Sequence, residues 1–356
     1  MTEASPGGRF ERHPRLTGAG LFVLALVALE VALRLASPVT LRFAHEMRRV
    51  HGYSRLSRVD LRPSQSARLR IDRSDRRPLF DFQLTTGING FRIVESEPEE
   101  VPRAARYLHA IGDSYTMGWG VAAAQSYPAQ LGRRLAPGLA VLNLGVDGFG
   151  AIGATAKSRS LADRYPPGAA VYLFSPNDPD DDVQASAVSR RTTASHVLHE
   201  AFHALRRSSY VAAIPFAVRY RLQFRAGPDA SAAIGPSGAL TGAGEVVWEQ
   251  PTALLLPEPE TLPAPEAGSP TFEALRAYRD FLKAREARLV VLVLSNQLES
   301  LRAYRFCKEQ GIEAHLFDVP PAMRIPGEGH FNANGNGAVA ALVAELLRKA
   351  PTGAGS

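Results

Sequence analysis

The chain has 356 residues, of which 45% are hydrophobic and 21% charged, an ordinary balance for a folded protein with a substantial core. Its single cysteine, Cys307, excludes an internal disulfide framework. The formal net charge of +6 lies entirely within residues 1–106, and residues 107–356 are neutral overall. A nucleic-acid-binding main domain would carry its own basic face, so we expect no nucleic-acid partner.

The first predicted element is an apolar helix over residues 16–36, preceded by a short tail at residues 1–15. Its sequence, LTGAGLFVLALVALEVALRLA, rises about 1.5 Å per residue and can cross the roughly 30 Å hydrocarbon layer of a membrane. Glu30 and Arg34 are four residues apart, so a helix lets them pair. We predict an uncleaved transmembrane signal anchor; a cleaved signal peptide and a buried soluble helix are the alternatives.

The next segment, residues 37–105, is rich in arginine, with scattered prolines and no sustained period. We predict a basic linker that ends in an extended lead-in around PLFDFQLTTGINGFR. Within it, LRFAHEMRRV (residues 41–50) can lie on anionic head groups as a short basic helix. Arginines flank the apolar helix on both sides, so the positive-inside rule leaves its orientation open.

Residues 106–350 alternate between short apolar runs and segments of helical period. Strands are predicted at 106–112, 140–146, 169–175, 288–295 and 312–320, and helices at 126–136, 151–165, 271–286, 297–311 and 336–349. This alternation predicts an α/β catalytic domain, a three-layer α/β/α sandwich with a parallel sheet. An insertion at residues 183–270 interrupts it, helical in its first half and a Gly- and Pro-rich surface excursion in its second.

Polar motifs follow four of the predicted strands: GDS with Ser114, LNLG with Gly145, SPND with Asn177, and GEGH with Glu328 and His330. The ends of successive parallel strands lie side by side, so these residues would meet at one rim. Ser114 would be the nucleophile, His330 its base, and Glu328 the acid that orients the imidazole. The backbone N–H groups of Ser114 and Gly145 and the amide of Asn177 would form an oxyanion hole.

This order of motifs resembles the SGNH (GDSL-type) hydrolase family over about residues 106–349. The four blocks of that family match Ser114, Gly145, Asn177, and His330 in an H-x-N-x-x-G stretch. The resemblance implies a flavodoxin-like fold and a serine esterase without a cofactor. The segments INGFR and GWGV are similar to membrane-anchored bacterial members. That similarity implies a catalytic domain on the extracytoplasmic side and an acyl ester of an envelope glycan or lipid as substrate.

The chain departs from the family's pattern at two places. Ser175 stands where the family usually has a glycine, two residues before the asparagine. The family's acid is usually an aspartate two or three residues before the histidine, where this chain has Gly327 and Glu328. Glutamate is one methylene longer than aspartate, so we expect the Glu328 carboxylate to stay partly exposed to water.

Other classes of function stay open on the sequence alone. HEAFH, residues 199–203, matches the zinc-protease signature, in which His199 and His203 share a helix face and Glu200 acts as base. No third ligand follows at the expected spacing, so an amphipathic helix over the active-site rim is favoured. An O-acyltransferase passes through the same acyl-serine intermediate as an esterase. A non-catalytic glycan-binding module is the last alternative, and the oligomeric state is open.

The acidic run at residues 178–182 is more typical of a helix N-terminus than of a hard-metal site, and no metal is predicted. Asp113 is expected to accept backbone hydrogen bonds behind the serine turn. Packing, capping or pocket-lining roles are expected for Tyr115, Trp119, Cys307, Asn332 and Asn334.

Overall fold

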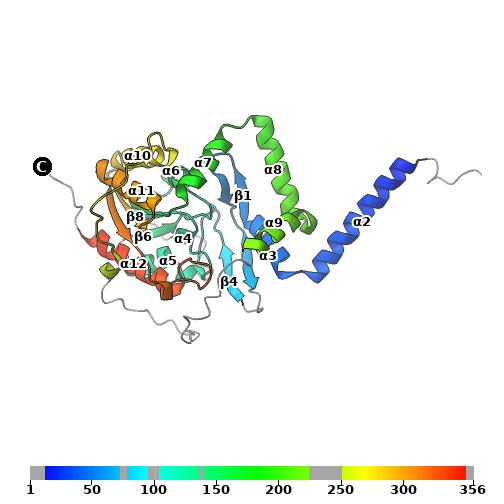
Figure 1. Ribbon diagram of the computed structural model, residues 1–356, viewed down its shortest axis with the longest axis horizontal. Helices are drawn as coiled ribbons and strands as arrows, with labels where there is room; N and C mark the ends of the chain where they lie inside the picture. The colour runs from blue at the N-terminus through cyan, green and yellow to red at the C-terminus, as the bar shows by residue number, and fades with distance from the viewer. Residues whose placement is uncertain are drawn as a thin grey trace, which may run out of the picture.

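The computed structural model of the chain describes residues 13–72, 78–94, 101, 104–135, 139–223 and 251–349. Its centre is a five-stranded sheet in which every pair of neighbours is parallel (Figure 1). The strands lie in the order β6 (Ala140–Asn143), β5 (Tyr107–Gly112), β7 (Pro167–Phe174), β8 (Arg288–Leu294) and β9 (Glu313–Phe317). Numbered along the chain, this is the order 2-1-3-4-5 of the flavodoxin-like doubly wound folds.

Helices cover both faces of this sheet and make it the middle of three layers, as predicted. One face packs against α5 (Tyr127–Leu135) and α12 (Ala333–Arg348). The other packs against α6 (Ala151–Leu161), α10 (Pro270–Lys283) and α11 (Leu298–Glu309). Strand β5 is buried along its whole length, which explains why it is a continuous apolar run without alternation.

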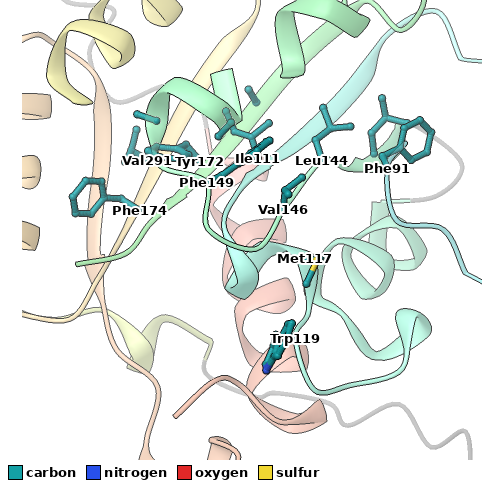
Figure 2. Close-up of a cluster of buried hydrophobic side chains, with 14 of the residues drawn as sticks. Phe91, Ile111, Met117, Trp119, Leu144, Val146, Phe149, Tyr172, Phe174 and Val291 are labelled. Atoms are coloured by element: carbon teal, nitrogen blue, oxygen red, sulfur yellow. The ribbon is translucent and has the colours of Figure 1, made fainter. Parts of the chain in front are cut away.

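The core extends from the sheet to the loops at its carboxyl edge. Figure 2 shows Ile111, Tyr172 and Val291 from three neighbouring strands, and each is fully buried. The same cluster continues to Met117 and Trp119, which follow β5. The turn that follows β5 is therefore held by the main hydrophobic core.

Residues 37–105 differ from the predicted linker, because their described part is folded. It holds helix α3 (Val39–Val50), the hairpin β1 (His51–Ser54)–β2 (Arg58–Leu61) and the hairpin β3 (Ser66–Asp72)–β4 (Pro78–Thr85). In β3 the apolar residues Ala67, Leu69 and Ile71 alternate with polar ones and are buried. The Phe43 ring of α3 packs against Trp119, with ring centroids 6.2 Å apart. This part of the chain therefore shares a core with the α/β domain.

The first half of the insertion is helical, as predicted. It forms α8 (Thr193–Ser208) and α9 (Tyr210–Gln223), preceded by α7 (Asp178–Ser189). Residues 224–250, which carry much of the predicted surface excursion, lie outside the described residues. The following segment runs along the edge of β9: the Leu256 N–H donates to Leu316 O at 2.9 Å, and the Asp318 N–H donates to Leu254 O at 3.0 Å. Its role is to cover a sheet edge.

Helix α2 (Pro14–Ala36) projects away from the rest of the molecule (Figure 1). It is the one described helix long and apolar enough to cross a membrane, and none of its apolar window is buried. Glu30 forms an ion pair with Arg34 at 2.7 Å. The Glu30 carboxylate also accepts the N–H groups of Tyr210 and Val211, each at 3.0 Å, at the start of α9. A charged residue of the apolar helix therefore caps a helix of the insertion.

Candidate active site

Ser114 occupies a sharp turn between β5 and the short helix α4 (Ser114–Met117). Gly112 has a φ of +147°, and a Cβ there would meet Leu173 O at 2.8 Å, so only glycine fits. Asp113 caps the helix, its Oδ1 accepting the Tyr115 N–H at 2.9 Å, as expected for a structural aspartate. The turn follows β5, whose neighbours are β6 and β7, at the carboxyl edge of the sheet, where ligands of doubly wound sheets bind.

A chain of hydrogen bonds joins the serine to the predicted base and acid. Ser114 Oγ lies 2.7 Å from His330 Nε2, and His330 Nδ1 lies 2.5 Å from Glu328 Oε1. The second oxygen of Glu328 accepts the His330 backbone N–H at 3.0 Å. Gly327 and Gly329 have φ of +75° and +97°, and these left-handed conformations bend the loop so that Glu328 reaches the imidazole.

The acid of this chain is buried, which differs from the partly exposed carboxylate expected from the sequence. The Glu328 side chain is 6% exposed and that of His330 is 20% exposed. The physical reason is the loop bend, which turns the longer side chain back under the histidine instead of outward. Burial alone would lower the pKa of His330, but the hydrogen bond and charge of Glu328 outweigh it, so the pKa is raised above 6.5.

Aromatic rings surround the imidazole. The Tyr115 ring is centred 4.5 Å from that of His330, and the Trp119 ring 6.2 Å away. Burial raises the pKa of the Tyr115 hydroxyl to about 12, so this group stays neutral. Ser114 itself is 7% exposed. Both pocket-lining candidates from the sequence thus lie beside His330, in a largely enclosed site.

Gly145 lies directly against the serine turn. A Cβ at this position would fall 2.2 Å from Met117 N, so a larger residue would displace the α4 backbone. The Gly145 N–H donates to Asn143 Oδ1 at 3.2 Å, and Asn143 Nδ2 donates to Met117 O at 3.2 Å. Close backbone approach therefore requires glycine here, independently of any role in catalysis.

Asn177 begins the loop into α7, and its residue is exposed. Its Nδ2 donates to Asp181 Oδ2 at 2.9 Å, and its side chain lies 2.9 Å from Ser175 Oγ. The Ser175 hydroxyl in turn lies 2.7 Å from Asp113 Oδ2, directly before the serine. Asn177 is thus linked to the Ser114 turn through two side chains.

Ser175, the residue that departs from the family's pattern, bridges two buried aspartates. Its Oγ lies 2.7 Å from Asp113 Oδ2 and 2.7 Å from Asp178 Oδ1. Burial raises the pKa of Asp178 well above its ordinary value and that of Asp113 to about 6. The Ser175 hydroxyl therefore joins the Ser114 turn to the start of α7.

Arg92 supports the same turn and was not singled out by the sequence analysis. Its buried guanidinium donates to Met117 O at 2.9 Å, Gly118 O at 2.6 Å and Val121 O at 2.7 Å. These carbonyls lie at the end of α4 and just after it, where several acceptors have no partner within the helix. The residue belongs to INGFR, but nothing in the sequence distinguishes it from the many arginines around it.

The zinc-protease signature lies on α8, which contacts β1, α3 and α9 and so differs from the predicted helix over the rim. His199 Nδ1 donates to Ser195 O at 2.8 Å, and the His199 ring stacks on the Tyr53 ring with centroids 5.7 Å apart. Glu200 pairs with Arg55 at 3.1 Å. Among the described residues, no group of three or more His, Cys, Asp or Glu side chains could hold a metal ion.

Asn332 and Cys307 have the structural roles expected from the sequence, and the acidic run begins helix α7 as expected. Asn332 caps α12 by accepting the Gly335 N–H at 3.0 Å. Cys307 is buried, and burial raises the pKa of its thiol to about 12, so it is a core residue. Of the acidic run, Asp182 accepts the N–H groups of Ala151 and Ile152 at 2.9 Å each, which caps α6.

Solved structures with a similar fold include several esterases, and no family model or curated protein matches the chain. A member of the lipolytic protein G-D-S-L family from Veillonella parvula is 11% identical, covers 69% of this chain and 100% of its own, and has a TM-score of 0.37. Est24, a carbohydrate acetylesterase from Sinorhizobium meliloti, is 10% identical, with coverage of 68% and 98% and a TM-score of 0.36. The aryl esterase of M. smegmatis is 14% identical, with coverage of 68% and 99% and a TM-score of 0.33.

Proposed function

We propose that the chain is a serine ester hydrolase of the SGNH type, anchored to a membrane by α2. The observation that carries the proposal is the continuous hydrogen-bonded series Ser114–His330–Glu328 at the carboxyl edge of the parallel sheet. A serine hydroxyl is a poor nucleophile until a base takes its proton, and His330 Nε2 is in place to do so.

In this mechanism Ser114 Oγ attacks the ester carbonyl carbon while its proton passes to His330 Nε2. The buried Glu328 carboxylate stabilises the resulting imidazolium through Nδ1–H. His330 then gives the proton to the departing alkoxide, and the acyl group stays on Ser114. Water, deprotonated by His330, attacks the acyl-serine, the carboxylic acid leaves, and the Ser114 hydroxyl recovers a proton.

The negative charge on the carbonyl oxygen needs donors during both attacks. The Ser114 amide lies at the first position of α4, so it has no partner within the helix. Gly145 packs against the same turn, and Asn177 is connected to it through Ser175. We assign these three groups to the oxyanion hole, which requires the Gly145 and Asn177 donors to turn from their present acceptors toward the substrate.

The proposed substrate is an acyl ester of an envelope glycan or lipid, handled on the extracytoplasmic side. The support is the apolar helix α2 and the similarity of INGFR and GWGV to membrane-anchored members of the family. Transfer of the acyl group to a sugar hydroxyl uses the same intermediate as hydrolysis. The reaction therefore has to be assayed with and without an acceptor.

A fluorophosphonate probe tests the proposal, because it reacts with activated serines. We expect covalent labelling of the wild-type chain, loss of labelling in Ser114→Ala and His330→Ala, and no effect of EDTA on ester hydrolysis. Hydrolysis that EDTA abolishes, without labelling, would contradict the proposal in favour of a zinc enzyme on His199, Glu200 and His203. No labelling and no turnover would favour a glycan-binding module.

A further inference from the structure

Helix α8 turns its apolar face outward. Val197, Leu198, Phe202 and Leu205 are 53%, 70%, 54% and 56% exposed, respectively. On a helix these positions lie on one side, since they fall within a single stripe of the 3.6-residue period. A soluble surface helix normally buries such a stripe and exposes its polar face.

The polar face of α8 is the side that packs inward. His196 Nδ1 lies 2.7 Å from the Tyr53 hydroxyl, and the Tyr53 ring contacts the rings of His199 and His203 at 5.7 and 5.5 Å. Burial lowers the pKa of His203 to about 4, so this histidine is neutral. Arg206 is 5% exposed. These contacts fix the rotation of α8 about its axis, so the outward apolar face is built into the fold.

Exposed large apolar side chains are concentrated on the helices next to α2, the candidate membrane anchor. Outside α2, six of the ten exposed large apolar side chains in the described part of the chain lie on α8 and α9; the two on α9 are Val218 and Leu222. Single exposed apolar side chains are normal, whereas a cluster marks an interaction site. Both helices lie on the side of the molecule from which α2 projects (Figure 1).

Two contacts hold these helices at one end of the apolar helix. The Arg34 guanidinium donates to Ser208 O, the last residue of α8, at 2.6 Å. Glu30 caps α9, and Leu33 packs against the cluster that contains Tyr210. Glu30 and Arg34 are the charged residues near the end of α2, where a membrane-spanning helix meets the head groups. If α2 crosses a membrane, these contacts place the turn between α8 and α9 at the depth of the lipid head groups.

We propose that the apolar face of α8, with Val218 and Leu222 of α9, lies in the interface of the same lipid bilayer that α2 crosses. The inference rests on the anchoring part of the proposed function and adds a second attachment point. An amphipathic helix of this kind buries its apolar side at the boundary between head groups and acyl chains. Exposed arginines beside it, Arg34, Arg219 and Arg221, complement anionic head groups.

A second attachment would fix the catalytic domain relative to the membrane. Helix α3 packs between α9 and β3, and its Phe43 contacts Trp119, whose ring lies 6.2 Å from that of His330. The docked helix would add a second attachment to the contacts that Glu30 and Arg34 already make with the insertion, and would hold the candidate active site at a set distance from the bilayer. That arrangement suits esters presented at the membrane surface.

The test uses the full-length chain in nanodiscs with single introduced cysteines. Cys307 is buried, so an environment-sensitive thiol fluorophore labels the introduced site. The test positions are Leu198→Cys and Phe202→Cys on α8. The matched control is Leu298→Cys on α11, which replaces the same residue type at 53% exposure. Leu24→Cys reports on α2. Quenching by lipids with doxyl-labelled acyl chains is measured at each position.

We expect labels at Leu198, Phe202 and Leu24 to be quenched several-fold more strongly than the label at Leu298. Quenching at Leu24 without quenching at Leu198 and Phe202 would overturn the docking of α8 and leave the anchor intact. No quenching at Leu24 would overturn the anchor itself, and the docking of α8 with it.

Discussion

Both carboxylate oxygens of Glu328 are engaged by His330, one by the ring and one by the backbone N–H. The residue therefore fixes the ring orientation and the position of the loop at once. Its side chain is 6% exposed, so water screens its charge only weakly. At the scale of the residue, a glutamate two positions before the histidine can replace the usual aspartate because Gly327 and Gly329 let the chain turn back.

Glu328→Gln should lower kcat by about 10³- to 10⁴-fold, because an amide cannot stabilise the imidazolium and favours the wrong tautomer. The measurement is turnover of a chromogenic ester, with thermal unfolding as a check that the variant folds. His330→Ala serves as the reference for complete loss. A loss below about 10-fold would mean that Ser114 and His330 act as a dyad.

The pH dependence follows from the same pair. The base must be neutral, so kcat/KM falls as the pH falls through the pKa of His330. Because that pKa is raised above 6.5, the acid limb of the wild-type profile should have its midpoint above pH 6.5. In Glu328→Gln burial still disfavours the cation while the raising contribution of the carboxylate is lost. The midpoint should therefore move to lower pH, and an unmoved midpoint would contradict this coupling.

At the scale of the element, several segments that are distant in sequence hold the turn at α4 in place. Arg92 donates to carbonyls at and after the end of α4, Gly145 packs against the α4 backbone, and the Ser175 hydroxyl binds Asp113 at the start of α4. Ser114 is thus positioned by the ends of β5, β6 and β7 and by the segment that carries Arg92. The geometry of the α4 turn depends on the close packing of Gly145 against Met117 as much as on the hydrogen bonds from Arg92 and Ser175.

Gly145→Ala should reduce stability by about 1–3 kcal/mol, because the new methyl overlaps the Met117 backbone. The matched control is Gly132→Ala on α5, where the nearest atom would be Val141 Cβ at an ordinary 3.7 Å. That variant should be neutral or stabilised by up to about 1 kcal/mol. The measurement is the free energy of unfolding in urea. Equal stability of the two variants would contradict the steric role of Gly145.

The elements of the α/β domain could be predicted because each parallel strand is a continuous apolar run followed by a helix-periodic segment. The hairpins at residues 51–85 were missed, although β3 and β4 alternate apolar and polar residues, because helix α3 covers their apolar face only in three dimensions. The proximity of Ser114, His330 and Glu328 could be predicted because each motif follows a strand of one parallel sheet. The support from Arg92 and the contact of Ser175 with two buried aspartates arise from burial and packing, which the sequence does not display.

At the scale of the whole molecule, the apolar helix, the insertion and the α/β domain are joined by a series of contacts. Helix α2 meets α9 through Glu30, α9 packs on α3, and α3 reaches the candidate site through Phe43 and Trp119. Packed side chains therefore join the apolar helix to the candidate site.

The side of the membrane can be determined with a reporter fused after residue 350 of the full chain. We expect an alkaline phosphatase fusion to be active, since that enzyme needs the disulfide-forming compartment outside the cytoplasm. A fusion to a protein that fluoresces only in the cytoplasm should be dark. Bright fluorescence with inactive phosphatase would reverse the proposed orientation and leave the site chemistry unaffected.

The central claim is that an acyl group forms a covalent ester with Ser114. The most direct measurement is mass spectrometry of the full chain quenched in acid during turnover of an activated short-chain ester, followed by proteolysis. We predict that the peptide carrying Ser114 gains the mass of the acyl group, and that Ser114→Ala and His330→Ala show no adduct. Turnover by Ser114→Ala at the wild-type rate, or an adduct on another residue, would contradict the account.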